Sequence, residues 1–69
     1  MSVYTIVDDF CVGQQRVLSL DRDIAPIDIA SSNNQVLIDG QKHHFLINSI
    51  RNCIIISSKE VFKSNQVKF

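Results

Sequence analysis

The dipeptide Asp39-Gly40 lies between the apolar-rich runs QVLI and QKHHFLI, and it constrains the fold of this chain more than any other feature. A two-residue type I′ hairpin turn needs positive φ at both central residues, which Asp followed by Gly tolerates. We therefore predict a β-hairpin here. The turn sets its cross-strand pairs, which are Ile38 with Gln41, Leu37 with Lys42, Val36 with His43, and Gln35 with His44.

Alternation then assigns the two faces of this hairpin, because successive side chains of a strand point to opposite sides. The more apolar face carries Val36, Ile38, His43, Phe45 and Ile47. The other face carries Leu37, Lys42, His44 and Leu46. We expect the first set to face the core, since a slip of one residue would exchange the two faces.

Two strand-like runs precede the hairpin, at residues 3–12 and 15–20, with Gly13 supplying backbone freedom between them. The adjacent acids Asp8-Asp9 interrupt the first run. They predict a bulge or bend at the point where this strand changes partners. The only proline, Pro26, indicates that residues 24–29 form an edge strand or an extended loop.

The second half of the chain continues the pattern of short runs and polar turns. Residues 53–56 are continuously apolar, which is typical of a central strand buried on both sides or of a strand in a closed barrel. Val61-Phe62 is expected to pack back on the core, and residues 67–69 to form a terminal strand. Helical spacing is almost absent. The prediction is an all-β fold: a small antiparallel β-barrel or sandwich of five to seven short strands, with little or no helix, as a single domain over residues 1–69.

Composition narrows the function classes. Seven basic residues balance seven acidic ones, which disfavours nucleic-acid binding because phosphate contacts drive much of that affinity. Neither a signal peptide nor an apolar run long enough to cross a bilayer is visible, so we expect a cytoplasmic protein with no membrane partner. Cys11 and Cys53 lie in apolar strand-like contexts and are expected to be reduced core thiols, the alternative being one disulfide in a secreted protein.

No residue pattern predicts catalysis, a metal or a cofactor. His43 and His44 are adjacent on a strand, so they point to opposite faces and are poorly placed to bind one ion together. Cys53 and His43 could be neighbours, but an apolar setting would keep the thiol protonated and inert. The acid pairs Asp8-Asp9 and Asp21/Asp23 are typical of solvated turns. We therefore expect a protein that is not an enzyme.

The order of features resembles the small β-barrel that forms the second domain of translational GTPases such as elongation factor Tu, which also occurs in short stand-alone bacterial proteins. The residues that carry the resemblance are Gly13 after Phe10; Val36, Ile38 and Gly40 in the hairpin; and Ile47 and Ile50 after it. The usual second strand of that family carries more glycine and a valine pair, where this chain has Arg16-Val17-Leu18. The resemblance implies a scaffold that docks onto something else and has no nucleotide-binding motif.

Candidate partner-binding residues fall into two groups. Asp21, Arg22, Asp23 and Asp28 flank the proline-bearing segment, with Arg51 and also Arg16 and Asn52 expected nearby. Leu37 and Leu46 on the outer face of the hairpin, together with His44, Tyr4 and Phe69, would leave an apolar patch rimmed by charge, which is typical of protein contacts. The alternative is that a second layer of the same domain covers these leucines.

The leading hypothesis is a non-enzymatic protein-interaction module of the inhibitor, immunity or accessory-factor type, from a bacterium or phage, that binds or occludes a protein partner, with homodimerisation as an option. The alternative is a barrel that binds nucleic acid or the ribosome, with Tyr4 or Phe45 stacking on bases. The polar residues of that alternative are Arg16, Lys42, His44, Arg51, Lys59 and Lys63.

Overall fold

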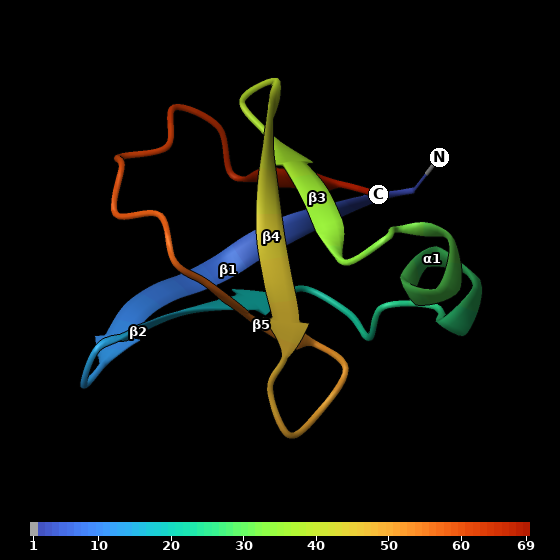
Figure 1. The fold of residues 1–69 in the computed structure, drawn as a ribbon, viewed down its shortest axis with the longest axis horizontal. Coiled ribbons are helices and arrows are strands. Elements are labelled where there is room, and N and C mark those ends of the chain that lie inside the picture. Colours follow the sequence, from blue (N-terminus) through green and yellow to red (C-terminus); the bar gives the residue numbers. More distant parts are fainter. Residues whose placement is uncertain (1) are drawn as a thin grey trace.

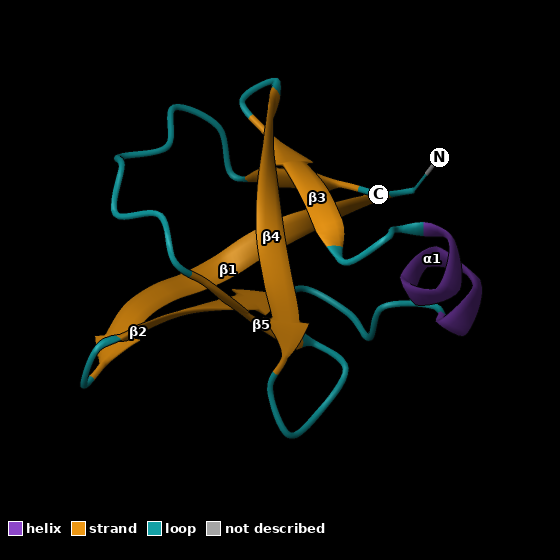
Figure 2. Ribbon diagram, in the orientation of Figure 1, coloured by secondary structure: helices purple, strands orange, loops and turns teal. Residues whose placement is uncertain are grey.

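A computed structural model describes residues 2–69 and shows a closed antiparallel β-barrel with strand order β1-β2-β5-β4-β3-β6 (Figures 1 and 2). The elements are β1 (Val3–Val12), β2 (Gln15–Leu20), α1 (Pro26–Ser31), β3 (Gln35–Ile38), β4 (Gln41–Ile47), β5 (Cys53–Ile56) and β6 (Gln66–Lys68). The predicted all-β class is confirmed. Within the described residues, the one helix is the six-residue α1, so no helix there is long and apolar enough to cross a membrane.

Two strands belong to both sheets of the barrel and close it. β1 pairs with β6 through Val3–Thr5 and with β2 through residues 6–12. β4 pairs with β3 through residues 41–44 and with β5 through Phe45–Ile47. β1 and β4 therefore each bend between the residues that pair with one neighbouring strand and those that pair with the other.

The central hairpin has the predicted register at all four pairs, from Ile38 with Gln41 to Gln35 with His44. Both turn residues have positive φ, 53° at Asp39 and 77° at Gly40, as a type I′ turn requires. Local turn chemistry was therefore sufficient to set the pairing of β3 with β4.

The predicted irregularity in β1 is also confirmed. The register with β2 shifts between Ile6 and Asp8, which is the point where β1 leaves β6 and continues along β2 alone. Gly13 follows with φ of 60°, as the first central residue of the two-residue turn into β2. The bulge bends β1 so that it pairs with β6 in one sheet and with β2 in the other, and Gly13 forms the turn into β2.

The core fills the inside of the barrel. Its buried members from the hairpin are Val36, Ile38 and Phe45, as predicted. Ile47 shares their side of the strand but lies at an open end and is 38% exposed. The other buried core residues are Tyr4, Leu18, Leu20, Ile24, Ile54, Ile56 and Val67. Val17 is also buried, but on the opposite side of β2 from Leu18.

The prediction of an edge strand or extended loop for residues 24–29 is wrong. Pro26 begins α1 instead, where its fixed φ suits a helix and its missing N–H would have had no helical partner. Ala30 and Ser31 also belong to this helix, so only residues 32–34 connect it to β3. The open edge inferred at this segment does not exist.

Residues 53–56 form a strand of the closed barrel, which is one of the two predicted settings: Ile54 and Ile56 face the core, whereas Cys53 and Ile55 are half-buried on the outside. One further prediction is corrected. Cys11 is not in the core but exposed, because the hairpin of β1 with β2 extends beyond the barrel there. Both cysteines are free thiols.

Residues 57–65, which we call the strap, cross from β5 to β6 without regular secondary structure. The Asp39 carboxylate accepts hydrogen bonds from the backbone N–H groups of Lys63 and Ser64, at 2.7 and 3.0 Å. Phe62 packs against the core as predicted, although its neighbour Val61 is almost fully exposed. The strap is thus held by side chains rather than by a strand ladder.

Candidate interaction surface

The charged residues predicted around Pro26 mostly serve the fold. Thr5 donates its N–H to the Asp21 carboxylate at 3.1 Å. Arg22 lies over the Tyr4 ring, 3.9 Å from its centroid, and donates to the Val3 carbonyl at 3.0 Å. These contacts tie the segment before α1 to β1, so Asp21 and Arg22 are not simply free for a partner.

Hydrogen bonds of the Tyr4 hydroxyl connect α1 to β1. This hydroxyl donates to Asp28 Oδ2 at 2.6 Å and accepts from the Ala25 N–H at 2.9 Å. The hydrogen bond from Tyr4 is the main reason that the pKa of Asp28 is lowered, with Ser2 contributing next. Tyr4 is fully buried and its ring meets Phe69 edge-on, so the predicted exposure of Tyr4 is wrong.

Arg51 lies beside this region as predicted, since its carbonyl accepts a hydrogen bond from Ile24 N–H at 3.0 Å. Asn52 is also near, because its carbonyl accepts from Leu20 N–H at 2.7 Å. The side chains of Asp23 and Arg51 remain exposed. Arg16 is not part of this group.

Arg16 lies at the other side of the molecule, beneath the strap. Its guanidinium forms a bidentate pair with Asp9, at 2.9 and 2.8 Å, and donates to the carbonyls of Ser58 and Glu60. It also lies 4.3 Å from the centroid of Phe62. The Arg16 hydrogen bonds lower the pKa of Asp9, and the same contact raises the pKa of Arg16.

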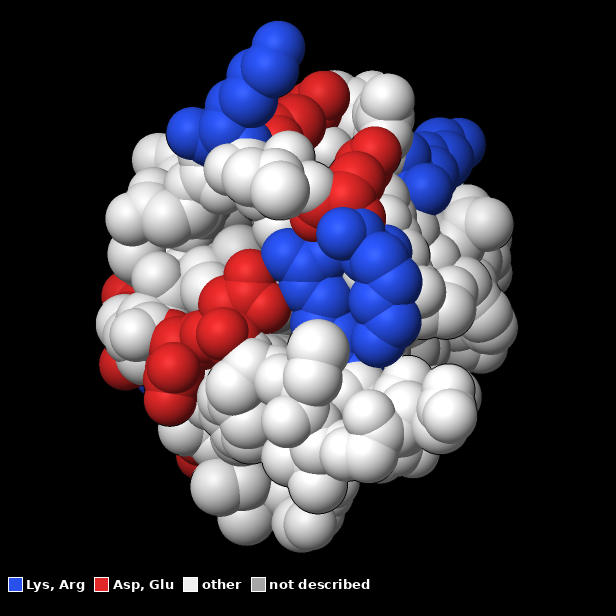
Figure 3. Space-filling view, turned by 90° about the vertical axis from the view of Figure 1, so that its left-hand side faces the viewer, with Lys and Arg blue, Asp and Glu red and all other residues white. Residues whose placement is uncertain are grey.

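We call this cluster of Asp9, Arg16, His43, Lys59 and Glu60 the charged end. His43 Nε2 lies 3.4 Å from Glu60 Oε1 without the geometry of a hydrogen bond, and its ring meets Phe62 edge-on. Figure 3 shows acidic and basic side chains next to one another on this side of the molecule. The charges here neutralise each other instead of forming a patch of one sign.

The residue types that bind metal ions do not gather in one place among residues 2–69. This part of the chain contains no group of three or more His, Cys, Asp or Glu side chains that could hold an ion. The sulfur of Cys53 lies 3.6 Å from the Ser19 hydroxyl, and that of Cys11 lies 3.9 Å from Lys59 Nζ. Neither cysteine contacts a histidine in these interactions.

An uncharged apolar surface lies on the outside of strands β1, β2, β5 and β4, and we call it the outer face. The register aligns Phe10 with Val17, Val17 with Ile55, and Ile55 with Leu46 in one row across the four strands. Phe10 and Leu46, at the two ends of the row, are 40% and 61% exposed, whereas Ile55 is half-buried and Val17 is buried beneath its neighbours. This row contains no Asp, Glu, Lys or Arg.

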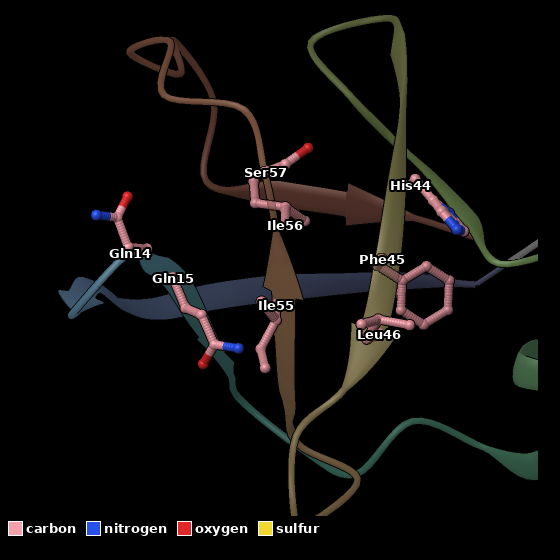
Figure 4. Close-up of a pocket in the computed structure, with 8 residues that line it drawn as sticks. All are labelled: Gln14, Gln15, His44, Phe45, Leu46, Ile55, Ile56 and Ser57. Atoms are coloured by element: carbon pink, nitrogen blue, oxygen red, sulfur yellow. The ribbon is translucent and has the colours of Figure 1, made fainter.

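A hollow of about 310 Å³ lies beside this row, between β2, β5 and β4 (Figure 4). Its outward-facing walls come from Gln15, Ile55, Ser57, His44 and Leu46. The hydrophobic floor and the Gln, Ser and His side chains around it suit an apolar side chain with a polar neighbour. Leu46 and His44 were predicted as partner-binding residues, and the structure does bring them together.

Leu37 does not belong to this surface. It is half-buried and lies opposite Lys42 in β4 and opposite Lys68 in β6, around the barrel from Leu46. Its neighbours on the adjoining strands are therefore lysines and not the apolar residues of the outer face. The predicted single patch of Leu37 with Leu46 is therefore wrong.

Sequence reasoning missed Phe10, Val12 and Ile55 as surface residues, and it missed Val17 as the buried residue that connects Phe10 to Ile55 in the row. A two-residue turn at Gly13-Gln14 pairs Val12 with Gln15 and hence Phe10 with Val17, so the signal was present. Ile55 was obscured because it lies within a continuous apolar run, where alternation gives no indication of the outer side.

Comparison with known proteins assigns no relative: no protein family, curated protein or solved structure matches the chain. The resemblance to the second-domain barrel of translation factors therefore stays a prediction.

Proposed function

We propose that this chain is a non-enzymatic protein-interaction module that binds a protein partner through the outer face. The observation that carries the proposal is the row of Phe10, Val17, Ile55 and Leu46, which crosses four strands without a formal charge. Depletion of charge around exposed apolar residues distinguishes the centres of protein interfaces from ordinary surface. Leu46 and the hollow beside it are the expected centre of the contact.

The polar residues around the row fit this role. Gln15, His44 and Ser57, the first residue of the strap, offer donors and acceptors at the rim of the hollow. Hydrogen bonds at such a rim orient a partner without the desolvation cost of a buried charge. Inhibition, immunity or accessory roles all require only such binding.

The alternative of nucleic-acid binding has less support. Phe45 and Tyr4, the aromatic residues predicted to stack on bases, are both in the core. Arg16 is buried and bound to Asp9, so it has no free guanidinium edge for phosphate. What remains is a set of exposed residues, Lys42, His44, Arg51, Lys59 and Lys63, without an aromatic platform.

The test compares Leu46→Asp with Ile27→Asp. Ile27 is 72% exposed on α1, so it is a matched apolar-to-acid change away from the outer face. A partner captured by the wild-type chain, identified and purified, should bind Ile27→Asp as it binds wild type and bind Leu46→Asp at least about tenfold more weakly. Equal binding by both variants would contradict the proposal.

A second experiment distinguishes the proposed protein binding from nucleic-acid binding. The chain is titrated with single-stranded DNA and RNA at low and moderate salt. Binding that falls steeply with added salt, and that Leu46→Asp leaves unchanged, would favour the nucleic-acid function instead.

A further inference from the structure

The outer half of β1 has a strand neighbour on one side only. β2 pairs with residues 8–12, whereas β6 pairs with β1 only from Val3 to Thr5. Within residues 2–69 that second side makes one further backbone hydrogen bond, from Ile6 N–H to the Asn65 carbonyl at 2.6 Å. Figure 1 shows the β1–β2 hairpin extending from the barrel toward the lower left. The barrel is closed, but this part of β1 presents a free edge.

The backbone groups on this edge follow from the hairpin. In a two-residue hairpin the pair flanking the turn is hydrogen-bonded, and every second pair after it is too. Val12 and Phe10 therefore direct their N–H and C=O groups to β2, while Cys11 and Asp9 direct theirs to the free edge. The Asp9 N–H donates to the Asp8 carboxylate at 3.1 Å, and residues 8–12 are exposed.

We propose that this edge pairs with the same edge of a second copy of the chain, antiparallel about a two-fold axis, with Phe10 opposite Phe10 of the second copy. Asp9 of each copy then lies opposite Cys11 of the other, and the two pairs exchange about four backbone hydrogen bonds, two of which replace the exposed contact of the Asp9 N–H with the Asp8 carboxylate. The inference uses an edge that the proposed function does not use. Each can therefore fail without the other.

The charges of β1 select this register. Pairing centred on Asp9 would place two carboxylates directly opposite each other, which is destabilising. Pairing centred on Cys11 would place Asp9 opposite the turn residue Gly13, where the ladder ends. Only the register centred on Phe10 gives two complete hydrogen-bonded pairs and keeps like charges apart.

This register is also complementary in charge. Lys59 Nζ lies 3.9 Å from Cys11 Sγ and donates to the Gln14 carbonyl at 3.3 Å. Asp9 of one copy, whose carboxylate remains bound to Arg16 of its own chain, would therefore approach Lys59 of the other. This self-complementarity is the reason to name a second copy as the occupant, rather than a strand of another protein.

Pairing would also join the apolar rows of the two outer faces. Phe10 ends its row at the free edge, so two copies meet at their phenylalanines and the row continues across the axis. Aromatic pairs directly opposite each other on antiparallel strands stabilise a sheet. Phe10, 40% exposed in one copy, would lose much of that exposure.

Disulfide cross-linking tests the register directly. In a Cys11→Ser, Cys53→Ser background, Phe10→Cys should form an intermolecular disulfide under oxidised glutathione, because opposed residues of a non-hydrogen-bonded pair have Cα atoms about 4.5 Å apart. Val12→Cys is the matched control, on the same side of the same strand but opposite Asp8 of the second copy. It should remain largely uncross-linked. Equal cross-linking of both variants would overturn the register.

Sedimentation velocity measures the dimer itself. Cys11→Pro removes an N–H on the free edge and leaves the β2 ladder in place, so it should raise the dimer dissociation constant about tenfold or more, while Cys11→Ser leaves it unchanged. A monomeric wild-type chain, or dimers that Cys11→Pro does not weaken, would overturn the proposal. Loss of dimer in Leu46→Asp would also do so, since that residue lies at the far end of the row.

Discussion

The charged end and the outer face share strands of the barrel, but the first buries and pairs a charged side chain whereas the second exposes apolar ones. At the charged end, Arg16 is buried and binds Asp9 and two strap carbonyls. On the outer face, Leu46 is exposed, and its row contains no formally charged side chain. The difference indicates that much of the charge of this small chain stabilises the fold, and it is the reason that we propose the exposed apolar side chains as the contact surface.

The largest expected effect is at Arg16. Arg16→Met keeps the aliphatic stem but leaves Asp9 and two strap carbonyls without their donor, so it should lower the free energy of unfolding by about 2–3 kcal/mol. Urea denaturation measures the change. Arg16→Lys, which keeps the charge without the bidentate geometry, should fall in between. A wild-type midpoint for Arg16→Met would show that the cluster is not structural.

A smaller effect is expected at the tether of α1. Tyr4→Phe removes a buried hydroxyl that serves both Asp28 and the Ala25 N–H, and it should cost about 1 kcal/mol of stability. Amide hydrogen exchange should become faster in α1 and remain unchanged in β5. Uniform acceleration across the barrel would contradict a local role.

Acid should act on the charged end in a predictable direction. The pKa of Asp9 lies below its ordinary value of 3.8 in the folded state, so its contribution to stability is present above that value and is lost as the pH falls through the folded pKa. Asp9→Asn should lower stability at neutral pH and flatten the dependence below about pH 4. Thermal midpoints between pH 2 and 7 measure both. If the thermal midpoint of Asp9→Asn fell below pH 4 as steeply as that of the wild type, this assignment would be contradicted.

The smallest effect on stability is expected on the outer face. Leu46→Asp replaces an exposed side chain and should change the free energy of unfolding by less than about 0.5 kcal/mol. The same denaturation experiment compares it with Arg16→Met. A loss of several kcal/mol would show that Leu46 belongs to the packed structure, and the contrast between the two regions would then be wrong.

The fold was largely predictable because its main determinants are local. Asp39-Gly40 specified the hairpin, and Asp8-Asp9 marked the bulge, since both depend on backbone conformation over a few residues. The helix at Pro26 was missed because proline suits the first turn of a helix as well as an extended edge, and a six-residue helix has too little periodicity to decide.

The surface was less predictable because it depends on contacts distant in sequence. From the sequence, Asp28 and Arg22 could not be distinguished from unpaired surface charges, because their contacts are with Tyr4, which is distant in the chain. The same is true of Arg16, which the distant strap covers. Leu46 was identified correctly from alternation within one strand. Its neighbours on the outer face also required the registers of β2 with β5 and of β5 with β4, which only the structure supplied.

The most direct test of the central claim is an NMR titration of the isotopically labelled chain with its purified partner. If the outer face is the contact, the largest amide shift changes will map to Gln15, Ile55 and Leu46, and the amides of α1 will change little. The largest changes at Arg22, Asp28 and Arg51, with the outer face unaffected, would contradict the account.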